Sequence, residues 1–211
     1  MDRALSYFGV YDVFGYLASG LSVVVGIWWL VEGSIPHLST VGLLGLVGAS
    51  YIAGQVTAIL GHFWEQVWFK WKGGKPYIRM LTEDDYEFGK SLRETLVTAI
   101  DGEVGVQGLS NRQRFNLARA KLRLVGFESR AETMRAMHGL CRNLAATAGA
   151  LFLTALVMFC IEGCETRLLA ATALSLPAVF AFGWRALRFE RRFGREVWLS
   201  YLALRMSPRP G

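Results

Sequence analysis

Long apolar stretches alternate with charged segments along this chain, and four of the apolar stretches are as long as a membrane-spanning helix. They cover about residues 13–31, 40–61, 144–161 and 168–187. Crossing about 30 Å of hydrocarbon takes about 20 helical residues. The middle of each stretch carries no charge, where an Arg or Asp would cost several kcal/mol. The pattern predicts an all-α polytopic membrane protein with four transmembrane helices.

The order of these stretches divides the chain into four parts. Residues 1–69 hold a first transmembrane hairpin, and residues 139–187 hold a second one. Between them, residues 70–138 predict a small helical module, and residues 188–211 form a basic tail. A module of about 60 residues is marginally stable alone. We therefore expect it to be stabilised by packing against the membrane, its own long helices or neighbouring copies.

Helix signals subdivide the module. Thr82 precedes three acidic residues and predicts the N-cap of a helix that ends near residue 100. Three glycines in residues 101–109 then predict a loop. Ser110 and Gln113 form a capping-box pattern at the start of a second helix.

The end of this second helix and the start of the next are also marked. Gly126 suits the position after the helix, which favours positive φ. Ser129 and Glu132 repeat the capping-box pattern, and no proline follows before the third apolar stretch. We expect one helix from about residue 130 to 161, which projects several turns out of the bilayer. Such a rod is able to carry motion between the module and the membrane.

The tail predicts an amphipathic C-terminal helix. At 100° per residue, aromatic and aliphatic side chains share one face of it. They are Phe189, Phe193, Val197, Tyr201 and Leu204, and the opposite face carries Arg188, Arg191, Arg192 and Arg195. The pattern favours an interfacial helix held by anionic lipid. Packing of the apolar face against the module or another subunit is the alternative.

Basic residues indicate the orientation in the membrane. The loop over residues 32–38 contains no Lys or Arg, and the loop between the last two spans is followed by Arg167 alone. The positive-inside rule then places both termini and the module in the cytoplasm, and we expect a bacterial inner membrane. The net charge of +6 reflects this bias, so direct nucleic-acid binding is not expected.

Aromatic residues cluster at the exit of the second span, as in the interfacial belts of membrane proteins. We expect Trp64, Trp68 and Trp71 to lie at the lipid interface together with the four arginines of the tail.

Four polar residues near the ends of the spans are candidates for an intramembrane ion-pair site. His62 and Glu65 are three residues apart and share a helical face, which suits proton relay, metal binding or a plain hydrogen-bonded helix contact. No H-E-x-x-H pattern is present, and we expect no metal and no other cofactor. We expect an ion pair between Arg142 and either Glu65 or Asp12, with a role in helix registration or in gating.

A second candidate site lies on the helix after Ser110. Arg112, Asn116, Arg119 and Arg123 fall within about 60° of arc on one face. Such a stripe could hold an anionic ligand, or could be a solvated face near an anionic membrane. The chain has no Gly-rich phosphate loop, nucleophile elbow or C-x-x-C pair, so we expect no catalytic residues and favour a protein that is not an enzyme.

Small residues crowd the first three spans and favour close helix packing. Four helices do not bury so many small faces alone, so we also expect a homo-oligomer. Examples are Gly15, Ser19, Gly20, Gly26, Gly42, Gly45, Gly48, Gly54, Ala148 and Gly149.

The segments YDVFGYLASG, GHFWEQ and MRAMHGLCRNLAATAGAL resemble a group of small bacterial four-span membrane proteins. In that group a Y-D-x-x-G-Y-x-x-x-G entry and an R-[NS]-L-A-A third span recur, and Ala18 departs from it because a proline is expected there. Some proteins of this kind act as membrane effectors or sensors in anti-phage defence. The resemblance implies such a role here and assigns no catalytic residues.

Three functions stay open at this point. The first is a non-enzymatic, oligomeric membrane effector whose module receives a signal, an anionic ligand or a partner encoded nearby, and alters membrane integrity, for example through a pore. The second is an ion- or proton-handling transporter or membrane-enzyme subunit that uses His62, Glu65 and Asp12. The third is a membrane anchor for a cytoplasmic partner.

Overall fold

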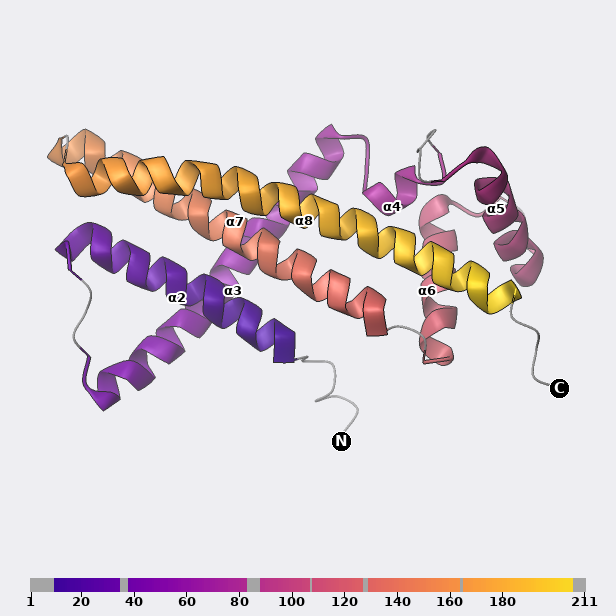
Figure 1. The fold of residues 1–211 in the computed structure, drawn as a ribbon, viewed down its shortest axis with the longest axis horizontal. Coiled ribbons are helices and arrows are strands. Elements are labelled where there is room, and N and C mark those ends of the chain that lie inside the picture. The colour runs from indigo at the N-terminus through magenta and orange to yellow at the C-terminus, as the bar shows by residue number, and fades with distance from the viewer. Residues whose placement is uncertain are drawn as a thin grey trace. The chain divides into compact units, whose positions relative to one another are not determined.

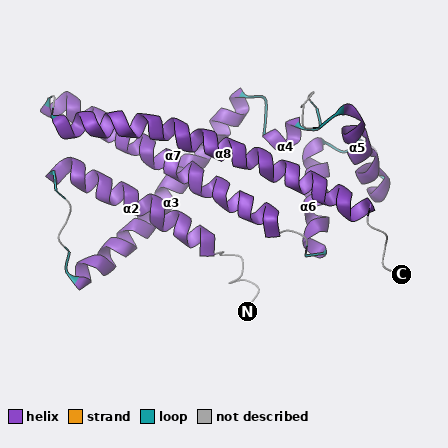
Figure 2. Cartoon of the chain, in the orientation of Figure 1, coloured by secondary structure: helices purple, strands orange, loops and turns teal. Residues whose placement is uncertain are grey.

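The structure is a computed structural model that describes residues 10–34, 38–82, 88–106, 108–126, 129–163 and 165–206. Within these ranges the chain is helical, and none of the described residues forms a strand (Figures 1 and 2). The predicted all-α class is therefore confirmed for this part of the chain.

Four helices are long and apolar enough to cross a membrane. They are α2 (Val10–Glu32), α3 (Thr40–Trp71), α7 (Ser129–Glu162) and α8 (Thr166–Met206). Each contains one of the four predicted spans, which confirms their number. The helices extend beyond the apolar stretches, since α3 meets no proline before Lys72 and α8 continues through Pro177 to Met206.

The chain divides into two compact units. The first, here the transmembrane unit, comprises Met1–Val67 and Ala136–Leu187. The second, here the helical module, comprises Trp68–Arg135 and Arg188–Gly211. The C-terminal part of α8 therefore belongs to the module, whereas its N-terminal part belongs to the transmembrane unit.

Glycines set the packing of the transmembrane unit where α2 crosses α3 (Figure 1). A Cβ atom on Gly20 would lie 1.6 Å from the carbonyl oxygen of Ser50, and one on Gly54 would lie 2.0 Å from that of Tyr16. Any larger side chain would collide with backbone at both positions. The small residues predicted to pack these helices therefore bring the two backbones into contact.

Hydroxyl groups add bonds at the same crossing. The Thr57 hydroxyl on α3 donates to the Ser19 hydroxyl on α2 at 3.3 Å. The Thr147 hydroxyl on α7 donates to the carbonyl oxygen of Ser19 at 3.1 Å, which ties a third helix to the pair. Elsewhere in the unit, Leu30, Ala155 and Leu168 form a small apolar core.

The helical module contains α4 (Pro76–Arg79), α5 (Lys90–Val104), α6 (Asn111–Leu124), the first turns of α7 and the end of α8. Its apolar core is large and rich in aromatic residues. The Tyr77 ring stacks on Phe115 at 4.0 Å, and the Trp198 indole nitrogen donates to the carbonyl oxygen of Tyr77 at 3.2 Å.

The apolar face of the tail contributes to this core. Five buried side chains come from α8, namely Phe193, Val197, Trp198, Tyr201 and Leu202. Of the two placements considered for this face, the structure has the one in which it packs against the module. The arginines Arg188, Arg191, Arg192 and Arg195 are exposed, and their contact with lipid stays a prediction.

Helix boundaries in the module depart from the expected ones at α5. This helix begins at Lys90 with Gly89 as its N-cap, and the Thr82 hydroxyl instead donates to the carbonyl oxygen of Arg79 at 3.1 Å. It also runs on to Val104, where Gly105 with φ of +67° ends it. The predicted N-cap at Thr82 and the predicted loop over residues 101–104 are therefore wrong, since Gly102 sits inside the last helical turns and the turn to positive φ comes only at Gly105.

Other boundaries agree with the sequence. Both bonds of the capping box between Ser110 and Gln113 are present, and Gly126 has φ of +72°. Helix α7 runs unbroken from Ser129 to Glu162, which confirms the long third helix. The Ser129 side chain lies outside the described part of the structure.

Candidate functional site

A buried polar cluster joins three helices of the transmembrane unit. The carboxylate of Glu65 on α3 lies between His138 and Arg142 of α7, and the carbonyl of Ala186 on α8 completes the group. His138 and Arg142 are four residues apart on one helix, so both reach the same carboxylate. The side chains of Glu65 and His138 are both 8% exposed.

The distances define the polar contacts of the cluster. Nη1 of Arg142 donates to Oε2 of Glu65 at 3.0 Å. Nε2 of His138 lies 3.4 Å from the same oxygen, and Nδ1 of His138 lies 2.9 Å from the carbonyl oxygen of Ala186. A buried charge without partners would cost several kcal/mol, so the ion pair and its hydrogen bonds are needed to keep Glu65 buried.

Gly61 makes room for this cluster one turn before Glu65. A Cβ atom on Gly61 would lie 3.2 Å from Cγ of Arg142 and 3.3 Å from its carbonyl oxygen. The absence of a side chain therefore lets α7 approach α3 closely enough for the ion pair.

The four residues predicted for an intramembrane site have different surroundings. Glu65 and Arg142 form one of the two ion pairs considered from the sequence. His62 is exposed, and its Nε2 lies 2.8 Å from the side-chain nitrogen of Gln66. Asp12 belongs to α2, and its side chain lies outside what the structure describes. His138 was missed, although its i,i+4 spacing to Arg142 was a usable signal.

The basic stripe on α6 is partly engaged within the module. Arg119 pairs with Glu132 at 2.7 Å and also lies over the Phe193 ring, with 5.5 Å between the guanidinium carbon and the ring centre. Arg123 pairs with the same carboxylate at 3.2 Å. Arg112 and Asn116 are exposed on the surface of α6. Two members of the stripe thus help to hold α6 against α7 and α8, and two face solvent.

Two acidic residues at the end of α5 were also missed, because a loop was expected over residues 101–109. Asp101 accepts two hydrogen bonds from the Arg114 guanidinium, at 2.9 and 2.7 Å. These bonds hold the pKa of Asp101 below its ordinary value.

Glu103 connects three helices of the module. It pairs with Lys121 on α6, accepts a hydrogen bond from the Tyr201 hydroxyl at 2.7 Å, and pairs with Arg205 at 3.0 Å. Burial alone would raise the pKa of Glu103, but the hydrogen bonds from Lys121 and Tyr201 outweigh it and lower the pKa.

Two of the three predicted interfacial tryptophans are exposed, and Trp68 is half-buried. Trp64 is 61% and Trp71 is 73% exposed. The Lys72 ammonium lies 5.0 Å from the Trp71 ring centre and 5.6 Å from that of Trp68. Aromatic rings beside a lysine are typical of the membrane–water boundary, and contact with lipid stays a prediction for these residues.

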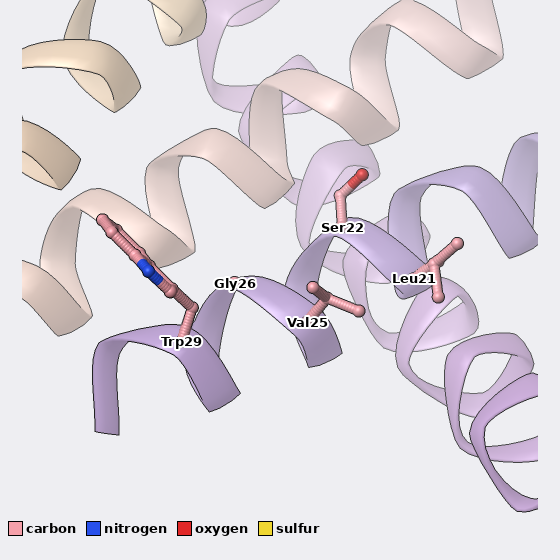
Figure 3. A pocket seen from close by; sticks show the side chains of 5 residues that line it. All are labelled: Leu21, Ser22, Val25, Gly26 and Trp29. Carbon is pink, nitrogen blue, oxygen red and sulfur yellow. The ribbon is translucent and has the colours of Figure 1, made fainter. Parts of the chain in front are cut away.

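An open apolar groove of ≈ 530 Å³ lies along α2 (Figure 3). It is lined by Leu21, Ser22, Val25, Gly26 and Trp29. The Ser22 hydroxyl donates to the carbonyl oxygen of Ala18 at 2.8 Å, within its own helix. The groove thus presents an almost wholly apolar surface on a helix that is able to span a membrane.

Comparison with protein families, curated proteins and solved structures finds no match for this chain. Among the described residues, no group of three or more His, Cys, Asp or Glu side chains could hold a metal ion.

Proposed function

We propose that this protein is a non-enzymatic membrane effector or sensor, in which the helical module receives a signal or partner and the transmembrane unit responds by altering membrane integrity. The module would lie in the cytoplasm with both chain termini, as the distribution of Lys and Arg favours. The resemblance to small four-span proteins of anti-phage defence supports this role and a bacterial inner membrane.

One structural observation carries the proposal. Helix α8 is a single helix of 41 residues that supplies one of the four candidate spans and then five side chains of the module core. A ligand that rearranged this core would act on a helix that also belongs to the transmembrane unit. Helix α7 has the same property over its 34 residues.

The exposed part of the α6 stripe is the proposed receiving surface. Arg112 and Asn116 face solvent, whereas Arg119 and Arg123 are held by Glu132. An anionic ligand or an acidic partner segment would meet this face first.

Phage infection of a bacterial host that expresses the protein tests this function. We expect dye entry and loss of membrane potential during infection, and we expect both to disappear in the variant Arg112→Glu/Asn116→Glu. Lys90→Glu is the matched control, because it reverses another exposed charge of the module on α5. An intact membrane in the wild-type strain under phage challenge would contradict the proposal, and so would full activity of the stripe variant.

We also propose that the protein works as a homo-oligomer in the membrane. On α3, Cβ atoms added to Gly45 and Gly48 would have no neighbour within 4 Å, so both glycines leave room for another helix. The mass of the detergent-solubilised protein tests this. A ring or closed tetramer would support an effector or channel, whereas a monomer would contradict the formation of a pore.

Ion or proton handling is the second candidate, and the buried Glu65 favours it. Loss of ion flux in Glu65→Gln and His62→Ala with normal assembly would support a transporter or enzyme subunit. Normal flux in both variants would support the effector.

A further inference from the structure

The two ring nitrogens of His138 face two different oxygen atoms, both of which accept hydrogen bonds. Nδ1 lies 2.9 Å from the carbonyl oxygen of Ala186 on α8. A carbonyl oxygen has no hydrogen to donate, so Nδ1 carries the hydrogen of this bond. The contact with α8 therefore requires that Nδ1 be protonated.

The other nitrogen then meets a carboxylate. Nε2 lies 3.4 Å from Oε2 of Glu65, and both side chains are buried. In a neutral imidazole with its hydrogen on Nδ1, Nε2 presents a lone pair. Two lone pairs would face each other where little water screens them, which is unfavourable. One more proton between Nε2 and Oε2 turns this repulsion into a hydrogen bond.

Arg142 decides which of the two groups carries that proton. Its Nη1 lies 3.0 Å from the same Oε2, and a guanidinium stays charged at any ordinary pH. The positive charge favours the ionised form of Glu65 and leaves the proton on the imidazole.

The neighbouring helices bring further ionisable groups to this end of the unit. Helix α7 carries Cys141 beside Arg142, and α8 carries Arg185, which interacts electrostatically with Cys141. On α3, His62 is exposed and hydrogen-bonded to Gln66. On α2 the acidic residue is Asp12, whose side chain lies outside the described part of the structure. Helix α8 also carries the buried Glu190, four residues after Ala186, and Glu65 of α3 contacts the ring.

We propose that His138 and Glu65 form a binding site for one proton, with His138 as an imidazolium that joins the carboxylate of α3 to the Ala186 carbonyl of α8. The proton acts as a structural ligand: it holds three helices together through one ring. The site does not depend on the proposed function, because it concerns the resting state without any signal or partner.

Nitrogen-15 NMR of the full-length protein in lipid nanodiscs tests the site. The chain has three histidines, so the variant His37→Gln/His62→Gln leaves His138 as the single imidazole signal. At pH 8, where a free imidazole with a pKa of about 6.5 is almost entirely neutral, we expect both nitrogens of His138 to be protonated. Restoring His62 adds the signal of an exposed imidazole for comparison. A spectrum with Nε2 unprotonated would overturn the proposal.

Glu65→Gln in the same background sharpens the result. A glutamine amide is able to donate to the Nε2 lone pair, so the second proton is no longer needed. We expect a change from double to single protonation, with the hydrogen kept on Nδ1. Glu162→Gln is the matched control, because it removes an acid that pairs with Arg167 elsewhere in the same unit. If double protonation persisted in Glu65→Gln, the Glu65 carboxylate would not be what holds the second proton. Its loss in Glu162→Gln would show that the effect is not specific to Glu65. Either result would overturn the proposed site.

Discussion

The transmembrane unit and the helical module bury different kinds of side chain. In the transmembrane unit several of the most buried residues are small, among them Ser19, Ser50 and Ala155. In the module the fully buried residues include Trp198, Tyr201 and Phe88. Both are built from helices, so the difference lies in what surrounds them.

The contrast fits the proposed placement of the two units, with one in lipid and the other in water. Lipid chains are as apolar as a leucine side chain, so burying large apolar groups between spans gains little, and close backbone approach with hydroxyl bonds takes over. In water, removing aromatic surface is the main driving force, at about 25 cal/mol per Å². The stability of helix contacts in the transmembrane unit therefore depends on how closely the backbones approach. In the module it depends on how much apolar area is buried.

The largest effect is expected when the module loses its central aromatic residue. Trp198→Ala removes a fully buried ring and its bond to Tyr77, and we expect it to lower the free energy of unfolding of the module by about 3–5 kcal/mol. Hydrogen exchange of amides in residues 96–122 measures the loss. Trp184→Ala is the control on the same helix, because Trp184 is 73% exposed. Equal protection in both variants would contradict the proposed core.

The next effect tests the close approach of the α2 and α3 backbones. In Gly54→Leu the new side chain would meet the backbone of Tyr16, and we expect a loss of about 1–3 kcal/mol or more in unfolding of the transmembrane unit in mild detergent. Gly45→Leu adds the same side chain to the same helix where a Cβ atom has no neighbour within 4 Å, so a single chain should tolerate it. If both variants unfolded alike, backbone contact at the crossing would not be what limits the side chain at residue 54.

Acidification should destabilise the module through two of its carboxylates. The pKa values of Asp101 and Glu103 are lowered in the folded module. Each ionised carboxylate therefore stabilises the folded module at pH values above its unfolded pKa of about 3.9–4.3. This stabilisation is lost as the pH falls through the pKa of the folded state. We expect a loss of about 1 kcal/mol for each carboxylate, because both are partly exposed. Denaturant unfolding of the module at pH 7 and pH 3 measures it, and Asp101→Asn should shrink the difference between the two pH values.

The smallest effect concerns a single helix end. Ser110→Ala removes the hydroxyl that accepts a hydrogen bond from the Gln113 backbone N–H at the start of α6, whereas the backbone N–H of residue 110 is still able to donate to the Gln113 side chain. We expect a loss of about 0.5–1 kcal/mol in the same module assay. Ser110→Asp keeps an acceptor at this position and should restore most of the stability. A stable Ser110→Ala variant would mean that the tertiary contacts of α6 fix its start without the cap.

The membrane part of the fold could be read from the sequence because apolar length alone identifies a span. The capping box at Ser110 and the positive φ at Gly126 were equally readable, since each depends on neighbours in sequence. The glycines were recognised as packing residues, but no local pattern tells that Gly20 and Gly54 touch backbone whereas Gly45 does not. That distinction depends on where two helices cross.

The candidate site was predicted in part for the same reason. The pair of Glu65 and Arg142 followed from opposite charges at similar depth, whereas His138 was overlooked because a histidine counted as neutral offers no charge to match. Asp101 and Glu103 were assigned to a glycine-rich loop, although Gly102 is tolerated inside α5 and the helix stops at Gly105. An isolated glycine weakens a helix by about 1 kcal/mol and does not end it, which is why a local reading misplaced both acids.

The contribution of α8 to the module core has a consequence for synthesis. Residues 88–126 leave the ribosome well before residues 193–202, and both segments of the second hairpin are translated in between. Until then Phe115 has Tyr77 but lacks Phe193 and Trp198, so the nascent module presents part of its apolar core to its surroundings. Synthesis of the last span must therefore precede completion of the module, and a ribosome that stalls before Phe193 would leave a chain whose module core is incomplete.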